Sequence, residues 1–142
     1  MTTLNQLLDS KGRQVWSIEP NDSVLDAIRL MAEKGVGALL VMQEDRLTGI
    51  LSERDYARKV ILEGKSSQHT PVSEIMTTNV LYASPEQSID ECMALMSAKH
   101  IRHLPIVDEA RVEGMISLGD LVKTIIDEQK RTIEHLERYI SG

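Results

Sequence analysis

The apolar positions of the chain alternate between helical and strand-like spacing. Two stretches, residues 24–32 and 89–96, repeat apolar residues at i, i+3, i+4 and i+7, which predicts two helices with one apolar face each. Each stretch is followed by two short apolar runs joined through a polar turn: ALLVM and LTGIL after the first, HLPIV and VEGMI after the second. Runs of this length around a turn are typical of β-hairpins. The chain therefore repeats a helix followed by a hairpin.

This repetition is an internal duplication. Residues 15–58 align without a gap on residues 80–123, at a constant offset of 65. Both copies open with a short extended segment, at 15–18 and 80–83. The helix follows a serine that precedes an acidic residue by three positions, which is the spacing of a capping box. A last helix is expected after Ser52 or Ser117, so each copy is predicted to be β-α-β-β-α.

The predicted fold class is α+β. One copy alone would leave a sheet face uncovered, whereas two can bury those faces against each other. We therefore expect one module over residues 1–142, with repeat 1 at 11–64 and repeat 2 at 76–128 packed through their sheets. A polar connector with a short helix near Pro71 should join the repeats.

Extra helices are expected at both ends of the chain. Leu4, Leu7 and Leu8 give the N-terminal segment one apolar edge. Towards the other end, and into a C-terminal extension at 129–142, apolar and neutral residues alternate at spacings of four and three: Val122, Ile126, Gln129, Ile133, Leu136 and Ile140. This spacing fits either a helix packed on its own domain or a dimerising helix pair.

Composition narrows the class of protein. The chain has 16 Lys+Arg and 22 Asp+Glu, a net charge of −6, which argues against general binding to nucleic acid or to anionic membranes. No apolar run approaches the roughly 20 residues of a membrane helix, and we expect no membrane insertion. The single cysteine, Cys92, suits a reducing compartment, so a cytoplasmic location is expected. The histidines lack metal-ligand spacing, so no metal site is expected.

One motif with possible chemistry occurs in both copies. GILSERD and GMISLGD place a serine three residues before an aspartate, as Ser52/Asp55 and Ser117/Asp120. Such a pair can be a helix cap, which contributes about 0.5–2 kcal/mol. It can also be part of a ligand site, because a carboxylate accepts hydrogen bonds from both hydroxyls of a cis-diol and a helix N-terminus favours anions. For a single copy the residues alone leave both interpretations open.

The repeated sequences GVGALLVM…GILSERD and HIRHLPIVD…GMISLGD resemble a pair of cystathionine β-synthase (CBS) domains, also called a Bateman module, of the free-standing bacterial kind. The resemblance covers residues 15–123. It implies a non-catalytic module that binds an adenosine-containing ligand (AMP, ADP, ATP or NAD) in the cleft between the repeats and signals occupancy to a regulated protein. It also implies a homodimer, and no catalytic cofactor.

The resemblance further implies two sites, each drawing on both repeats. Nucleotide-binding site 1 would combine Ser52, Arg54, Asp55, Thr78, Asn79, Val80, Ile101, Arg102 and His103, with Arg102 and His103 at phosphate. Nucleotide-binding site 2 would combine Gly12, Arg13, Gln14, Val36, Gly37, Ala38, Ser117 and Asp120. The second site is expected to be less basic, because Gly37 and Ala38 stand where Arg102 and His103 stand in the second copy, so the two sites should differ in affinity or ligand. No lysine is obvious in the sequence at the second site.

Two other function classes are alternatives to this module. The first is an interaction or scaffold module with vestigial pockets that dimerises through its C-terminal helix. The second is an enzyme acting on the nucleotide, which is disfavoured because the sequence shows no nucleophile with a paired base and no acidic metal cluster.

Overall fold

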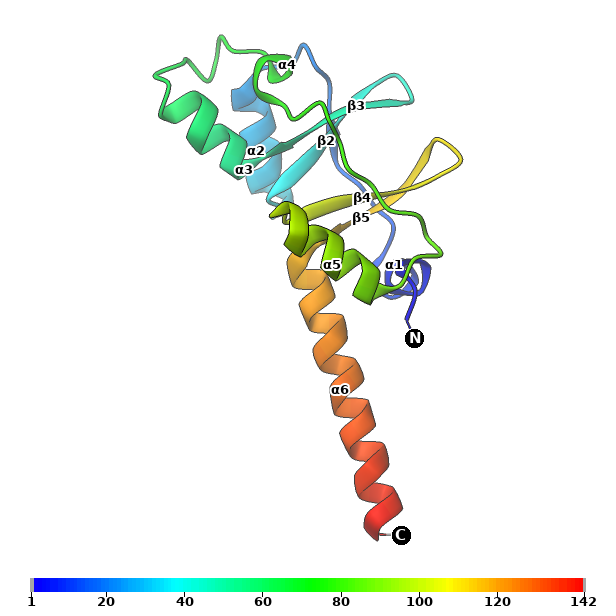
Figure 1. Ribbon diagram of the computed structural model, residues 1–142. Helices are drawn as coiled ribbons and strands as arrows, with labels where there is room; N and C mark the ends of the chain where they lie inside the picture. The colour runs from blue at the N-terminus through cyan, green and yellow to red at the C-terminus, as the bar shows by residue number, and fades with distance from the viewer. Residues whose placement is uncertain (1, 142) are drawn as a thin grey trace. The chain divides into compact units, whose positions relative to one another are not determined.

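A computed structural model describes residues 2–141, and the chain forms two compact units (Figure 1). One unit is the continuous segment Gln14–Tyr82. The other joins the chain up to Arg13 with the chain from Ala83 onward. We call them the continuous unit and the split unit. Each contains one of the two predicted hairpins, so the fold is mixed α and β, as the repeat predicts.

The continuous unit is built around a three-stranded sheet in the order β1-β2-β3. Strand β1 runs parallel to β2, and β2 is antiparallel to β3. The elements are β1 (Ser17–Ile18), α2 (Val24–Lys34), β2 (Ala38–Gln43), β3 (Arg46–Ser52), α3 (Glu53–Tyr56), a turn of π-helix (Ala57–Ile61) and α4 (Val72–Ile75).

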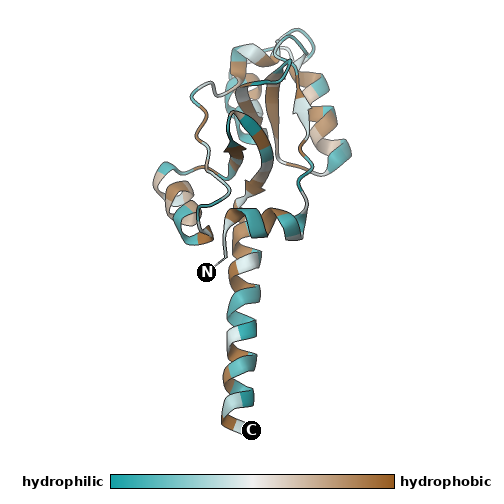
Figure 2. Cartoon of the chain, turned by 90° about the vertical axis from the view of Figure 1, so that its right-hand side faces the viewer, coloured by the Kyte–Doolittle hydropathy of each residue, from teal (hydrophilic) through white to brown (hydrophobic). Residues whose placement is uncertain are grey.

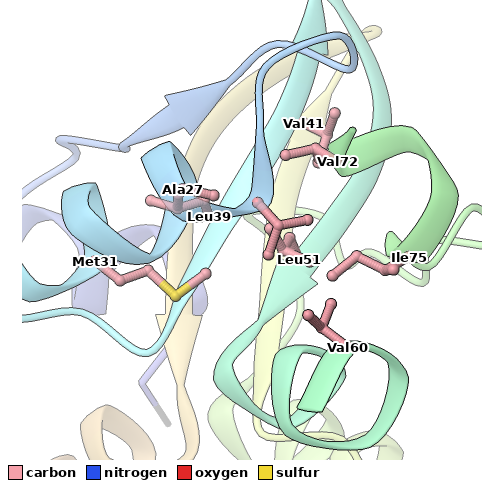
Figure 3. Close-up of a cluster of buried hydrophobic side chains, with 9 residues drawn as sticks. Ala27, Met31, Leu39, Val41, Leu51, Val60, Val72 and Ile75 are labelled. Atoms are coloured by element: carbon pink, nitrogen blue, oxygen red, sulfur yellow. The ribbon is translucent and has the colours of Figure 1, made fainter. Parts of the chain in front are cut away.

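Helix α2 confirms the helical pattern read from the sequence. It begins after Ser23, whose Oγ accepts a hydrogen bond of 3.1 Å from the backbone N–H of Asp26. It ends at Gly35, which adopts the left-handed conformation with a φ of 67° that favours glycine. Its apolar face packs with the sheet, the π-helical turn and α4 in one core (Figure 3), made of Val24, Ala27, Met31, Leu39, Val41, Leu51, Val60, Val72 and Ile75.

The split unit has a two-stranded antiparallel sheet, β4 (His103–Asp108) with β5 (Arg111–Ser117). Helices α1 (Leu4–Lys11), α5 (Ile89–Lys99) and α6 (Leu118–Ser141) complete it. Helix α5 begins in a full capping box between Ser88 and Glu91.

The extended segment expected at 80–83 does not form a strand, which corrects the sequence prediction. Only an isolated bridge joins Ala83 to Ile106. In the continuous unit, by contrast, Leu40 N–H donates to the carbonyl of Trp16 across the parallel pair, at 3.1 Å. The residue equivalent to Leu40 is Pro105, which has no N–H to donate. The first strand is therefore reduced to one bridge in the second copy.

Helix α1 precedes the first repeat in the sequence but packs within the split unit, on the second. Leu4, Leu7 and Leu8 are all buried, and Leu4 N–H donates to the carbonyl of Gln87 at 2.8 Å. A Cβ at Gly114 of β5 would lie 2.6 Å from Leu8 Cδ2. The missing side chain therefore lets α1 approach the sheet closely.

The equivalent glycine of the continuous unit has the same role. A Cβ at Gly49 of β3 would lie 2.7 Å from Met76 Sδ and 3.0 Å from the carbonyl oxygen of Thr77. Thr77 also pairs with Ile50 of β3. The glycine that the duplicated sequence retains thus makes room for a covering segment in each unit.

Helix α6 extends beyond the rest of its unit (Figure 1). It contacts that unit as far as Glu128, whose carboxylate accepts a hydrogen bond from the Thr2 hydroxyl. Every residue from 131 to 141 is exposed. Apolar and polar residues alternate along the exposed part (Figure 2). The structure confirms the long tail helix. Its last turns do not pack on their own unit, so the interpretation as a helix packed on its own domain does not hold for them.

Among residues 2–141, no helix combines the length and the apolar character needed to cross a bilayer.

Candidate functional site

Both Ser-x-x-Asp motifs lie where the last strand of a unit ends and the next helix begins, and both form capping boxes. In the continuous unit, Asp55 N–H donates to Ser52 Oγ at 3.2 Å, and Ser52 N–H donates to Asp55 Oδ2 at 3.0 Å. In the split unit the equivalent distances for Ser117 and Asp120 are 3.1 Å and 2.9 Å. The capping interpretation is therefore confirmed at both motifs, and it holds each carboxylate at a helix N-terminus.

Asp120 is also paired with a lysine from α1. Lys11 Nζ lies 2.7 Å from Asp120 Oδ2 and donates to the carbonyl of Met115 at 2.7 Å. Partial burial alone would raise the pKa of Asp120, but the Lys11 ammonium and the Ser117 hydrogen bonds outweigh it, and the net pKa is below the ordinary value. Asp120 is thus ionised at neutral pH. The sequence shows no obvious lysine near the second motif, and in the structure α1 provides one.

Asp55 is paired differently, by a lysine of its own helical segment. Lys59 Nζ lies 3.1 Å from Asp55 Oδ1, and it also donates to the carbonyl of Ile75 at 3.0 Å. The two residues are at i and i+4, which is a standard spacing for helical ion pairs. The two motifs therefore share the cap but differ in the origin of the cation.

Each motif lies beside the entrance of the preceding strand in its own unit. Glu53 N–H donates to the carbonyl of Gly37 at 3.0 Å, and Ala38 is the cross-strand partner of Ser52. Leu118 N–H donates to the carbonyl of Arg102 at 2.8 Å. The structure therefore brings Gly37 and Ala38 together with Ser52 and Asp55.

In the split unit the equivalent neighbours are Arg102 and His103. His103 is the cross-strand partner of Ser117, and both residues line the same pocket. Arg102 and His103, expected in site 1, thus lie next to the motif of Ser117, which was expected in site 2.

The other predicted residues are divided between the units as follows. The continuous unit contains Gln14, Val36, Arg54, Thr78, Asn79 and Val80, and the split unit contains Gly12, Arg13 and Ile101. Arg13 follows α1 and is paired with residues of that helix, because its Nη2 lies 2.5 Å from Asp9 Oδ1 and 2.7 Å from Asn5 Oδ1. Each predicted site draws on both units, and its grouping across them stays a prediction.

The split unit has an open pocket of about 780 Å³ at the base of α6. Its size is suitable for a nucleotide-sized ligand. Basic, apolar and hydroxyl groups occur together in it: Arg102, His103, Ser117, Leu118, Gly119, Val122, Lys123, Ile126, Asp127 and Lys130. Three of these residues were predicted from the sequence, namely Arg102, His103 and Ser117.

Sequence reasoning missed the α6 residues of this pocket. They include Gly119, Val122, Lys123, Ile126 and Lys130, which fall at i, i+3, i+4, i+7 and i+11 and so share one face of the helix that the motif begins. Extending the motif along that face would have found them. No group of three His, Cys, Asp or Glu side chains is arranged to hold a metal ion among residues 2–141.

Comparison with known proteins agrees with the duplicated architecture. The CBS domain family model matches residues 12–62 and 72–127. The mitochondrial CBS domain-containing protein CBSX3 of Arabidopsis thaliana is 36% identical over 151 residues, which cover 99% of this chain and 73% of the relative.

Solved structures are similar over most of their length. A protein with CBS domains from Burkholderia ambifaria has a TM-score of 0.88 and 54% identity, over 90% of this chain and 96% of that one. The CBS domain pair of protein MJ0100, solved with 5′-methylthioadenosine and S-adenosyl-L-methionine, has a TM-score of 0.81 and 25% identity, over 90% and 98% of the two chains. This chain therefore belongs to the CBS domain family and carries two CBS domains in tandem.

Proposed function

We propose that this protein is a regulatory module that binds an adenosine-containing ligand at its Ser-x-x-Asp motifs and conveys occupancy to a regulated protein. The main support is the pocket of the split unit, where Arg102 and Lys123 provide positive charge beside an apolar wall of Leu118, Val122 and Ile126. An apolar wall suits a purine ring, and basic side chains at a helix N-terminus suit phosphate or carboxylate. The adenosine-containing ligands in the MJ0100 pair support the same ligand class.

The residue roles follow from these chemical types. Asp55 and Asp120 would accept hydrogen bonds from ribose hydroxyls, and Arg102 with His103 would contact the phosphate or another anionic group. Asp120 already accepts from Lys11 and Ser117. A ribose would therefore share or displace the Lys11 contact, which couples ligand binding to the docking of α1.

Both predicted sites remain part of the proposal. The module would act in the cytoplasm, without catalysis and without a catalytic cofactor. Bound ligand would shift the equilibrium between the free protein and its complex with the regulated protein only as far as the ligand binds one of these two states more tightly. The experiment below first determines which ligand binds: AMP, ADP, ATP, NAD, 5′-methylthioadenosine or S-adenosylmethionine.

The test is a thermal-unfolding panel with these six ligands, followed by calorimetric titration of any ligand that raises Tm. A ligand at about 100 times its Kd should stabilise the native protein by about 2.7 kcal/mol. Arg102→Ala should abolish the rise, whereas Arg111→Ala, an exposed arginine at the opposite end of the hairpin, should retain it. Asp55→Asn and Asp120→Asn then report on the two motifs separately. If none of the ligands shifts the wild type, the motifs are caps only, and the scaffold interpretation replaces the sensor.

A further inference from the structure

The exposed part of α6 presents an apolar stripe that its own unit does not cover. The stripe, called the seam below, consists of Val122, Ile126, Gln129, Ile133, Leu136 and Ile140. Ile126 is 45% exposed, Ile133 55%, Leu136 53% and Ile140 82%. Spacings of four and three place isoleucine at every a position of a heptad, and Val122, Gln129 and Leu136 at d. An exposed apolar stripe of this length is typical of an interaction surface.

We propose that the seam packs antiparallel against α6 of a second copy, so that the end of each helix lies along the pocket at the base of the other. Val122 and Ile126, the first two seam residues, line that pocket together with Arg102 and His103 of β4 and its entrance. Val122 and Ile126 also belong to the wall proposed above for a purine ring, so the antiparallel dimer and a ligand in this pocket would exclude each other, and ligand binding would shift the dimer towards single chains.

One antiparallel register pairs the entire seam. It places Val122 opposite the partner's Ile140, Ile126 opposite the partner's Leu136, and Gln129 opposite the partner's Ile133. The same register places Tyr139, which is 83% exposed, opposite the partner's Ile125. The large apolar side chains at the exposed end thus meet the partly exposed apolar side chains at the base.

The charges beside the seam favour the antiparallel orientation. Lys123 and Glu137 both occupy e positions, which face one another in an antiparallel pair. The dimer would then contain two identical pairs between Lys123 and the partner's Glu137. A parallel pair would instead place Glu137 opposite the partner's Thr132 and form no such charge pair. The antiparallel register also brings Lys130 near the partner's Lys130, a repulsion that solvent screens at an exposed site.

Oligomeric state gives the first test. Sedimentation equilibrium of the wild type over a concentration series should approach twice the chain mass of 15.9 kDa. Leu136→Lys should return the mass to that of one chain without changing the circular dichroism spectrum, because the side chain is exposed. The matched control Arg138→Glu lies off the seam and should remain dimeric. A monomeric wild type, or a dimer that Leu136→Lys leaves intact, overturns the proposal.

Disulfide cross-linking tests the orientation. Ile126→Cys and Leu136→Cys are prepared separately, while the native Cys92 is buried and stays in place. In the antiparallel register neither variant cross-links alone, and an equilibrated mixture of the two does. Cross-linking of Leu136→Cys alone indicates a parallel pair and overturns the register. This readout requires no nucleotide, so its failure is distinguishable from failure of the proposed ligand binding.

Discussion

Lys11 and Asp120 are separated by 109 residues in the sequence, yet their side chains form an ion pair of 2.7 Å that joins the end of α1 to the start of α6. The pair connects the segment before the first repeat to the motif of the second. Because Asp120 also caps α6, a single carboxylate fixes both the helix start and the docking of α1.

Removing the lysine should lower stability and raise the pKa of Asp120. We expect Lys11→Met to reduce the free energy of unfolding at neutral pH by about 0.5–1 kcal/mol, a modest value because solvent screens a pair that is about one third exposed. The lowered pKa stabilises the fold above the ordinary Asp pKa of about 3.9, and this contribution is lost as pH falls through the folded value.

Urea unfolding at neutral pH and at an acidic pH below the folded-state pKa of Asp120 measures both effects. The difference between wild type and Lys11→Met should shrink in acid, where Asp120 is protonated in both proteins. Lys130→Met, which removes a lysine from the pocket rim, is the matched control and should leave the pH dependence unchanged. An equal loss at both pH values would mean that Lys11 stabilises α1 without acting through Asp120.

Gly114 should not tolerate a side chain while Leu8 is present. We expect Gly114→Ala to destabilise the fold by about 1–3 kcal/mol, because the added Cβ would lie 2.6 Å from a fully buried leucine methyl group. Gly119→Ala is the control: its nearest neighbour, Ser117 Oγ, is at 3.7 Å, and alanine at a helical position should be neutral or stabilising.

The steric origin can be separated from a backbone effect by a double-mutant cycle. Leu8→Ala alone should cost about 2–5 kcal/mol as a core truncation. In the Leu8→Ala background, Gly114→Ala should cost little, because the methyl groups that it meets are gone. Strictly additive losses in urea unfolding would contradict the proposed contact.

Most of the fold could be predicted because periodicity reports local structure directly. The helical spacing from Val24 and from Ile89 gave both central helices, and the paired apolar runs gave both hairpins. The docking of α1 on β5 could not be predicted, since Leu8 and Gly114 are far apart in sequence and no local pattern connects them. The missing strand at 80–83 could have been anticipated, because Pro105 removes a donor that its counterpart Leu40 provides.

The candidate site was predictable to the same extent. The Ser-x-x-Asp spacing identified both caps, and Lys59 was within reach of the i, i+4 rule from Asp55. Lys11 could not be predicted as a partner of Asp120, because their ion pair depends on where α1 packs. Local spacing therefore finds partners within an element, whereas partners from other elements require the tertiary fold.

Cys92 should be unreactive in the folded protein. Burial raises the pKa of its thiol to about 11, so little thiolate is present at neutral pH and the sulfur is also shielded from reagents. Iodoacetamide should label Cys92 slowly in buffer and rapidly in urea, as measured by mass spectrometry. Ser97→Cys, on an exposed position of the same helix, provides the control and should be labelled at once in both conditions. Equal labelling of the native Cys92 in buffer and in urea would contradict its burial.

The cap at the start of α6 should depend on the hydroxyl of Ser117. Ser117→Ala removes the acceptor of the Asp120 N–H and should cost about 1 kcal/mol in urea unfolding. It should also raise the pKa of Asp120, because the hydroxyl contributes to lowering it. Ser117→Thr keeps an acceptor and should retain most of the stability, whereas Ser141→Ala, at the exposed end of the same helix, should change nothing. If Ser117→Thr loses as much stability as Ser117→Ala, the shape of the side chain at the pocket, rather than its capping hydroxyl, determines which residue is tolerated at this position.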